Sequence, residues 1–567
     1  MQGLMMNVPL MISSLIRHAD IYHGDAEIVS RTIEGPMHRY TYREAHTRAR
    51  RLVRALERLG VKPGDRVGTL AWNGYRHFEL YYAVSGMGAV IHTVNPRLFH
   101  DQLVYIVNDA EDKVLLFDIN LAALVEKLAP ACKGVKRWIA LADREHLPKV
   151  AIPGLGCYEE LLATEDDGFD WPVFDENTAA GLCYTSGTTG HPKGVLFSHR
   201  STVLHAFAIS LPDTKNLSAR SSVLAIVPMF HVNAWGIPYA APMVGAKLVF
   251  PGAALDGASL YELMEMEEVD STSAVPTVWM SLVNYMREHK LRFSTLKSTT
   301  IGGAACPPAL LDTLENEFGV RVAHGWGMTE MSPVGTINAA KANARTLSPE
   351  ARRQLALKQG RPLYGVEIKT VDGAGKDLPR DGKSAGNILV RGPWVLSRYF
   401  KDAGGDPLTP EGWFPTGDVG TIDADGYLQI TDRSKDVIKS GGEWISSIEL
   451  ENIAVGHPAV AEAAVIGVRH PKWDERPLLI VVKRPDVEVG KEALLKFYEG
   501  KIAKWWLPDD VVFVDELPHT ATGKLSKRTL RERFKDYRLP TATVVGPDSS
   551  AQRANEFAPT SPRRRES

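Results

Sequence analysis

At residues 184–195 the chain reads YTSGTTGHPKGV, a run rich in glycine, threonine and serine that follows an apolar segment. The apolar segment, Ala179–Tyr184, predicts a buried strand that leads into a loop. Gly187 and Gly190 allow backbone N–H groups to approach an anion, and Lys193 adds a mobile positive charge. The pattern therefore predicts a loop that binds a polyphosphate.

General interpretations of this loop do not account for the whole string. The common nucleotide P-loop requires Lys followed by Ser or Thr, whereas Lys193 lies between Pro192 and Gly194. An ordinary surface turn would share the composition but not the order of the residues. The complete string resembles the signature loop of the adenylate-forming enzymes, the family of acyl-CoA synthetases, firefly luciferase and peptide-synthetase adenylation domains.

Separate motifs follow the loop in the order found in that family. The resemblance extends from about Ala26 to Leu539, which is nearly the whole chain. The strings that carry it are PMFHVNAWG (228–236), STTIGGAA (298–305), HGWGMTEMSP (324–333), GWFPTGDVG (412–420), ITDRSKD (430–436) and PHTATGK (518–524).

The composition is typical of an enzyme that acts on small molecules. Lys and Arg number 66 and Asp and Glu number 68, a net charge of -2, so we expect no broad basic surface for nucleic acid or an anionic membrane. The four widely spaced cysteines predict neither a metal-binding pair nor a disulfide framework. No apolar run reaches the roughly 20 residues that a membrane span needs. We expect a cytoplasmic protein without stable membrane insertion, and a homodimer stays open.

Candidate strands and helices alternate along the first third of the chain, which predicts an α/β fold with a parallel sheet. Examples are strands at Arg66–Ala71, Ala89–Thr93 and Val114–Asp118 and a helix at Arg76–Gly86. The resemblance implies a large N-terminal domain (1–432) of stacked αβα layers with a β-barrel-like subdomain. It also implies a small, mobile α+β domain (433–540), and we expect the tail (541–567) to be disordered.

The resemblance implies an ATP site with Mg²⁺. Lys193 is implied at the β- and γ-phosphates, Thr329 as a phosphate donor, and Glu330 with Thr185 as Mg²⁺ ligands, since a carboxylate beside phosphates needs a cation between them. Asp418 is implied at the ribose hydroxyls, although it also reads as a turn aspartate. The implied ATP-binding residues are Thr185, Ser186, Gly187, Thr188, Thr189, Gly190, Lys193, Gly303, His324, Gly325, Trp326, Met328, Asp418, Ile430 and Arg433.

A second predicted strand, Val223–Val227, ends at the PMFHVNAWG string. Open α/β sheets bind ligands at the carboxyl ends of their strands, so this segment is a candidate pocket wall. A core histidine and tryptophan at a strand end is the simpler structural alternative. The resemblance favours an acyl pocket, with implied residues Phe230, His231, Val232, Trp235, Gly302 and Gly327. These motifs contain no Arg or Lys for a second carboxylate, which favours a monocarboxylic acid.

The last third of the chain resembles the family's hinge and small domain. Asp432 and Lys435 are implied hinge residues, and Lys524 is implied as the catalytic lysine that bridges the carboxylate and the α-phosphate. After a domain rotation, a further segment would admit CoA: Lys439, Gly441, Gly442, Glu443 and Trp444. A helix at Glu492–Trp505 completes the expected module.

Two other features are interpreted as structural. Gly382–Gly386 fits the GxSxG hydrolase pattern, but a strand, Asn387–Arg391, follows it instead of a helix. Tyr81 and Tyr82 and the pair Trp72-Asn73 are expected in the core or in a turn, because nothing polar converges on them.

The resemblance thus implies an AMP-forming acyl-CoA ligase with ATP and CoA as co-substrates. The motif strings are most similar to bacterial medium-chain acyl-CoA synthetases, a group that includes 3-methylmercaptopropionyl-CoA ligase. A short- to medium-chain fatty acid or 3-methylmercaptopropionate is therefore the expected acid. Alternatives are a long-chain or aromatic acid, a carrier-protein adenylation enzyme, a luciferase-like enzyme and a non-catalytic nucleotide-binding regulator.

Overall fold

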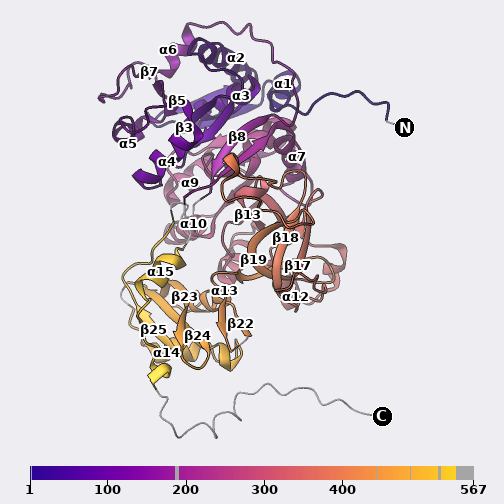
Figure 1. Cartoon of the computed structure of the whole chain (residues 1–567), viewed down its shortest axis with the longest axis vertical. Helices are drawn as coiled ribbons and strands as arrows, with labels where there is room; N and C mark the ends of the chain where they lie inside the picture. Colours follow the sequence, from indigo (N-terminus) through magenta and orange to yellow (C-terminus); the bar gives the residue numbers. More distant parts are fainter. Residues whose placement is uncertain (2, 186–190, 442, 486, 521–524, 544–567) are drawn as a thin grey trace. The chain divides into compact units, whose positions relative to one another are not determined.

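The computed structural model describes residues 1, 3–185, 191–441, 443–485, 487–520 and 525–543 (Figure 1). The chain forms two compact units. The large unit contains Met1–Thr416 and Gly420–Ile430, and the small unit contains Gly417–Val419, Thr431–Thr520 and the described residues from Leu525 on. The main passage from the large to the small unit therefore falls between Ile430 and Thr431.

A seven-stranded sheet lies in the N-terminal part of the large unit, in the order β7-β6-β5-β3-β4-β8-β9. Neighbouring strands are parallel except for β8 and β9. The predicted parallel sheet is confirmed. Its strands are β3 (Arg66–Leu70), β4 (Val90–Thr93), β5 (Asp112–Phe117), β6 (Arg137–Ala140), β7 (Gly156–Cys157), β8 (Ala179–Tyr184) and β9 (Gly194–Ser198).

A nine-stranded sheet follows, in the order β16-β15-β14-β13-β12-β10-β11-β1-β2. The strands from β14 to β1 are parallel, and β2, β15 and β16 are antiparallel to their neighbours. The strands are β1 (Glu27–Arg31), β2 (Met37–Thr41), β10 (Ser222–Leu224), β11 (Lys247–Phe250), β12 (Ser271–Ala274), β13 (Ser298–Ile301), β14 (Arg321–Gly327), β15 (Val334–Ile337) and β16 (Arg361–Pro362).

The strand predicted at Val223–Val227 is shorter in the structure, where β10 ends at Leu224. Beyond that point the Ala225 N–H still donates to the Val249 carbonyl at 3.0 Å, and a side chain binds the rest of the segment. The Asn73 amide donates to the carbonyls of Ala225 and Val227, and Asn73 Oδ1 accepts from the Met229 N–H. Asn73 is therefore a buried structural residue, as expected.

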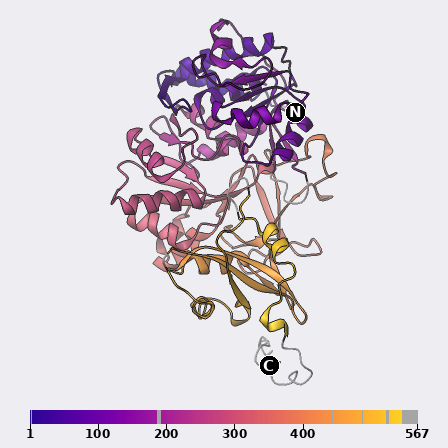
Figure 2. The same cartoon turned by 90° about the vertical axis from the view of Figure 1, so that its left-hand side faces the viewer.

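In the large unit, helices cover the faces of the two large sheets (Figures 1 and 2). Alternate strand residues face opposite sides of each sheet. Ile28 and Val67, one from each sheet, join a single core with the helices between the sheets, whereas Val29 packs toward α9 and Phe117 toward α4 and α5. The helices between the sheets are α1 (Ile12–His23), α2 (Tyr42–Arg58), α3 (Tyr75–Gly86), α7 (His199–Ser210) and α8 (Ile237–Val244). The outer helices are α4 (His100–Ala110), α5 (Ala122–Leu128), α9 (Gly257–Met266) and α10 (Pro276–Glu288).

Helix α2 shows how local sequence sets these elements. Thr41 and Glu44 form a capping box, in which Thr41 Oγ1 accepts from the Glu44 N–H and Glu44 Oε2 accepts from the Thr41 N–H. Gly60, with φ of 84°, follows the helix in the left-handed conformation that glycine allows.

The part expected to be barrel-like is a four-stranded sheet in the order β17-β18-β19-β20. An isolated bridge between Gly360 and Leu428 links it to the segment that precedes β16. The elements are β17 (Glu367–Val371), β18 (Gly386–Arg391), β19 (Phe414–Ile422) and β20 (Leu428–Arg433), with α11 (Pro308–Asp312) and α12 (Pro349–Leu357) preceding them in the chain.

The small unit is an α+β module with a core on each face of its sheet, as predicted. The sheet order is β22-β21-β24-β23, and β25 pairs with β24. The helix predicted to reach Trp505 ends at Phe497, because Gly500 takes a φ of 74° and turns the chain. The elements are β21 (Ile438–Ser440), β22 (Glu443–Ile445), β23 (Val460–His470), β24 (Asp474–Lys483), β25 (Asp510–Phe513), α13 (Ser447–Val455), α14 (Lys491–Phe497) and α15 (Lys527–Arg533).

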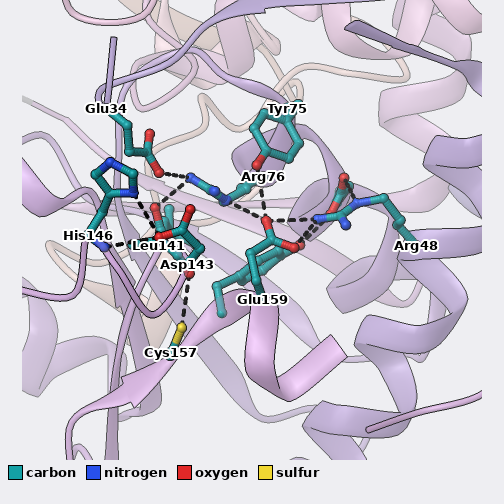
Figure 3. A network of polar contacts seen from close by, with 12 residues as sticks. Glu34, Arg48, Tyr75, Arg76, Leu141, Asp143, His146, Cys157 and Glu159 are labelled. Atoms are coloured by element: carbon teal, nitrogen blue, oxygen red, sulfur yellow. Dashed lines mark hydrogen bonds and ion pairs between the residues drawn. The ribbon is translucent and has the colours of Figure 1, made fainter. Parts of the chain in front are cut away.

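A polar network ties together α2, α3 and α6 (Tyr158–Ala163), as Figure 3 shows. Glu159 accepts from Arg48, from the Tyr75 hydroxyl at 3.0 Å and from Arg76 at 2.7 Å, and Arg76 also binds Glu34 at 2.6 Å. Burial opposes ionisation of Glu159, but the two guanidinium groups outweigh it and lower the pKa of the carboxyl. None of the motif residues takes part in the contacts drawn, so we regard this network as structural.

In the part of the chain that the structure describes, no helix is long and apolar enough to span a bilayer.

Candidate active site

The predicted phosphate loop joins two paired strands. The Thr185 N–H donates to the Lys193 carbonyl at 2.9 Å, and the Lys193 N–H donates to Thr185 Oγ1 at 3.2 Å. These bonds fix the base of the loop at the carboxyl end of β8, beside the parallel strand β4. Five predicted phosphate-binding residues lie outside the described residues, and their contacts stay predictions: Ser186, Gly187, Thr188, Thr189 and Gly190.

Tyr399 connects two residues that separate motifs supplied. The Lys193 ammonium lies 4.8 Å from the centre of the Tyr399 ring, and the Tyr399 hydroxyl donates to Glu330 Oε1 at 2.8 Å. Burial, with the Glu330 carboxylate beside it, raises the pKa of the Tyr399 phenol far above its ordinary value. Tyr399 therefore remains a hydrogen-bond donor. A predicted phosphate-binding cation and a predicted metal ligand thus share one neighbour.

Strand β14 and the turn after it carry the HGWGMTE residues. Thr329 and Glu330 follow the strand in a short turn, and each is 8% exposed. The Met328 N–H donates to the Pro333 carbonyl at 3.0 Å. A Cβ on Gly327 would collide with the same Pro333 carbonyl, which explains the glycine at this position. The turn therefore holds Glu330 rigidly.

Two predicted ATP-binding residues of this region have structural contacts of their own. His324 is 2% exposed and its Nδ1 is bonded to the Leu357 carbonyl at 2.9 Å. Burial lowers the pKa of His324, so the imidazole is neutral. The Ile430 N–H donates to Gln359 Oε1 at 2.6 Å. Contacts of His324, Ile430, Gly325, Trp326 and Met328 with ATP stay predictions.

A pocket brings the phosphate loop next to the predicted acyl site. Tyr184 and Thr185 line it from the loop, and Phe230 and His231 line it from the segment after β10. Its remaining lining residues are Thr93, Asn95, Leu98 and Ile106. Residues 45 positions apart in the sequence therefore share one cavity. The segment predicted to bind phosphate and the segment predicted to bind the acid therefore lie next to each other.

The predicted acyl residues continue into an unusual turn, η2 (Val232–Gly236). Val232, Asn233, Ala234 and Trp235 all have positive φ, between 47° and 54°, which costs L-residues free energy. The Asn233 side chain anchors the turn, because its Oδ1 accepts from the Tyr81 hydroxyl at 3.1 Å.

This turn directs the Trp235 indole onto a glycine. A Cβ on Gly302 would lie 3.0 Å from Trp235 Cη2 and 3.0 Å from the Gly325 carbonyl oxygen. Gly303, with φ of 77°, follows in the left-handed conformation. The structure therefore brings Trp235 and Gly302 together, and their role in an acyl pocket stays a prediction.

Asp418 and Arg433, the predicted ribose-binding residues, lie together in the small unit. Arg433 Nε is 3.5 Å from Asp418 Oδ1, and the Asp418 side chain is 12% exposed whereas that of Arg433 is 54% exposed. The guanidinium can therefore orient a carboxylate that still reaches solvent.

The two predicted hinge residues have different surroundings. Asp432 is buried, and its Oδ2 accepts from both the N–H and the hydroxyl of Ser447. Lys435 is exposed in a turn, and among the described residues its N–H donates no backbone hydrogen bond. Asp432 is thus fixed within the small unit, whereas the described backbone does not hold the Lys435 N–H.

The predicted CoA segment forms the edge hairpin β21–β22. Lys439 pairs with Trp444 and Ser440 pairs with Glu443. The Lys439 N–H donates to Glu475 Oε2 at 3.0 Å, and the Gly441 N–H donates to the Trp473 carbonyl at 2.8 Å. Gly442 and Lys524 lie outside the described residues, and no contact is assigned to them.

Family models match most of the chain. The AMP-binding enzyme model matches residues 16–400, and the model of the AMP-binding enzyme C-terminal domain matches residues 449–524. The chain belongs to the AMP-binding enzyme family.

Several curated relatives of this AMP-binding enzyme are named as CoA ligases. The chain is 54% identical to a 3-methylmercaptopropionyl-CoA ligase of Ruegeria lacuscaerulensis, over 94% of this chain and 99% of the relative. It is 49% identical to a medium-chain-fatty-acid CoA ligase of Ectopseudomonas oleovorans, over 96% and 100% of the two chains. The crystal structure of an anthranilate CoA ligase in complex with anthranoyl-AMP has the same fold, with a TM-score of 0.82 at 24% identity and coverage of 93% and 98%. The predicted enzyme class, an acyl-CoA ligase, is confirmed.

Sequence analysis missed Tyr399 in this AMP-binding enzyme. Tyr399 precedes Phe400 in a loop and belongs to no recognised motif string. Its relation to Lys193 and Glu330 depends on packing between segments about 70 and 200 residues apart, for which the sequence gives no local signal.

Proposed function

We propose that this enzyme activates a short- to medium-chain monocarboxylic acid, or 3-methylmercaptopropionate, with ATP and transfers the acyl group to CoA. The carboxylate attacks the α-phosphorus of ATP, and pyrophosphate leaves. The CoA thiol then attacks the acyl carbon of the adenylate, and AMP leaves. The observation that carries the proposal is the pocket lined by both Thr185 and His231, which joins the phosphate loop to the acyl segment. The identity to relatives named for these acids supports the choice of substrate.

The first step brings two anions together, so the site has to offset Coulomb repulsion. Lys193 lies at the base of the loop, where its ammonium can bind the β- and γ-phosphates. Thr329 directly precedes Glu330 in the same short turn, and its hydroxyl can donate to a phosphate oxygen. Lys524, which the sequence supplies, would bridge the reacting carboxylate and the α-phosphate.

Mg²⁺ fits the donor set around Glu330. This ion is usually held through one or two carboxylates together with substrate phosphates and water. The buried Glu330 carboxylate and the Thr185 hydroxyl are oxygen donors of this kind. Bound there with ATP, the ion would neutralise phosphate charge.

The second half-reaction is assigned to the small unit. Asp418 and Arg433 would hold the ribose, and a rotation at Lys435 would bring the hairpin with Lys439, Gly441 and Trp444 to the CoA thiol. The separation of these residues in a compact module of their own supports this assignment. Because ATP and CoA are cytoplasmic co-substrates, we propose that the enzyme acts in the cytoplasm.

The half-reactions can be tested separately with Lys524→Ala. We expect the rate of acyl-adenylate formation, measured by pyrophosphate exchange, to fall by several orders of magnitude, because the bridging charge is lost. Thioester formation from preformed acyl-adenylate and CoA should remain largely intact. An equal loss in both half-reactions would contradict the assignment of Lys524.

The acid is tested by measuring kcat/KM over straight-chain, methylthio and aromatic acids. We expect the highest values for 3-methylmercaptopropionate or for straight chains of short to medium length. A maximum at an aromatic or a long-chain acid would leave the ligase assignment intact but replace the proposed substrate.

A further inference from the structure

Lys215 is a buried lysine beside the acyl residues that no motif contains. It follows α7 and is 6% exposed. Its backbone is fixed, because the Lys215 N–H donates to the Ile209 carbonyl at 3.1 Å and the neighbouring Thr214 hydroxyl donates to the Leu211 carbonyl at 2.7 Å. The side-chain nitrogen donates to Ser273 Oγ. The amine is therefore held in one place.

The position of Ser273 brings this amine close to two of the predicted acyl residues, Trp235 and Gly302. Ser273 lies near the carboxyl end of β12, opposite Thr300 of β13, and Gly302 follows Thr300 by two residues. Lys215 Nζ lies 5.9 Å from the centre of the Trp235 ring, the same ring whose edge packs against Gly302. The amine and the glycine thus both lie beside one indole.

The charge of Lys215 has no ion-pair partner among the described residues, and burial lowers the pKa of Lys215 to about 7. The neighbouring His205 cannot help, because burial, together with Lys215, lowers the pKa of its imidazole to about 3. His205 Nε2 accepts from the Val334 N–H at 3.2 Å, so the neutral ring is already engaged. An ammonium group offers three hydrogen-bond donors, and Ser273 takes one of them.

We propose that Lys215 is a specificity-determining residue that donates to an oxygen at the far end of the acyl chain. The preferred acids then carry a hydrogen-bond-accepting oxygen, such as a keto or carboxylate oxygen, distal to the reacting carboxyl. A bound oxygen would occupy the donors that Ser273 leaves and would offset the cost of an unpaired buried cation. This inference rests on the proposed ligase function and refines its substrate. It also qualifies the expectation that no lysine is available for a second polar group, since Lys215 comes from outside the motifs.

The test compares matched acids in the full-length enzyme. Pentanoate is paired with levulinate, which has the same chain length and a keto oxygen near its end, and hexanoate is paired with adipate. The kcat/KM of the oxygenated acid is divided by that of its plain partner in the wild type, in Lys215→Met and in the exposed-site control Lys297→Met. Met keeps the length and removes the donors.

We expect at least one pair to give a ratio that falls about tenfold or more in Lys215→Met and stays unchanged in Lys297→Met, as expected for loss of a hydrogen bond to a charged group. Ser273→Ala, which removes the internal acceptor but keeps the amine, should retain or increase the preference. Melting curves of each variant show whether it is folded.

Two results would overturn the inference, and they differ. Equal ratios in the wild type and Lys215→Met, with plain acids still activated, would make Lys215 a core residue while the ligase function stands. Absence of acid-dependent pyrophosphate exchange with every acid in the wild type would remove the proposed function and this inference with it.

Discussion

Glu330 gains its position from neighbours that its motif does not include. The motif predicts a carboxylate near phosphates, but the direction of that carboxylate depends on the hydroxyl of Tyr399. The Leu396 N–H also donates to the Glu330 carbonyl at 2.7 Å, so the loop before Tyr399 is attached to the same turn. Residue identity was predictable because the chemistry demands a carboxylate. The residues that position Glu330 were not predictable, because tertiary packing brings them together.

Replacing Glu330 by Gln tests its role as a metal ligand. The neutral amide keeps the shape but loses the charge that Mg²⁺ prefers. We expect a higher Mg²⁺ concentration for half-maximal pyrophosphate exchange. Tyr399→Phe is the matched comparison, since it keeps the carboxylate but removes the hydroxyl that orients it, and it should raise the Mg²⁺ requirement less than Glu330→Gln does. Unchanged Mg²⁺ dependence in Glu330→Gln would argue against this ligand.

Burial of the Lys215 amine should make the folding stability of the protein depend on pH. Its pKa is lowered from 10.5 to about 7 by burial, so the unfolded chain binds the proton more tightly than the folded one. The free-energy cost of burying the charged amine is absent above pH 10.5, the pKa in the unfolded chain. This cost grows as the pH falls from 10.5 toward 7 and is complete below pH 7. Lys215→Met should therefore raise the melting temperature of the ligand-free protein more at about pH 6.5 than at about pH 9.5. Lys297→Met should show no such trend, and an equal shift at both pH values would contradict the prediction.

At the scale of elements, η2 is the part that sequence patterns describe least well. Propensity gives no reason for four successive non-glycine residues with positive φ, although Asn233 is a residue type that tolerates this conformation. Contacts from distant segments stabilise the turn, including the Tyr81 hydroxyl on Asn233 and the packing of Trp235 on Gly302. The prediction of Trp235 as a pocket residue came from the family motif. The backbone that places it comes from the fold.

Two buried alanines test the strain in this turn. Ala234 lies in η2 with φ of 49°, and Ala240 lies in helix α8. Glycine relieves a positive φ but weakens a helix, each by about 1 kcal/mol. We expect Ala240→Gly to lower the melting temperature and Ala234→Gly to leave it unchanged or raise it. Equal destabilisation by both changes would mean that η2 is not strained.

At the scale of the whole molecule, the sequence predicted the kinds of elements better than their arrangement. Alternating strands and helices indicated parallel sheets, and both large sheets are mainly parallel. The strand order was not predictable, because β1 and β2 join the nine-stranded sheet beside β11 instead of pairing with β3. Pairing between strands that are distant in the sequence depends on which apolar faces fit together. Local sequence periodicity does not indicate which strands will pair.

The division into two units leads to a prediction about Lys435. Asp432 is attached to Ser447, and Lys527 donates to the same hydroxyl and lies 2.9 Å from Glu451, so the chain before the turn is fixed to the small unit. Lys435 is exposed and donates no backbone hydrogen bond among the described residues, so proline there removes none.

Proline fixes φ near about -65°, so Lys435→Pro should block the proposed rotation without unfolding the unit. We expect pyrophosphate exchange to continue and CoA-dependent turnover to stop. Lys435→Ala, which keeps backbone freedom, should support both. If Lys435→Pro also supports both at the wild-type rate, the pivot lies at another residue.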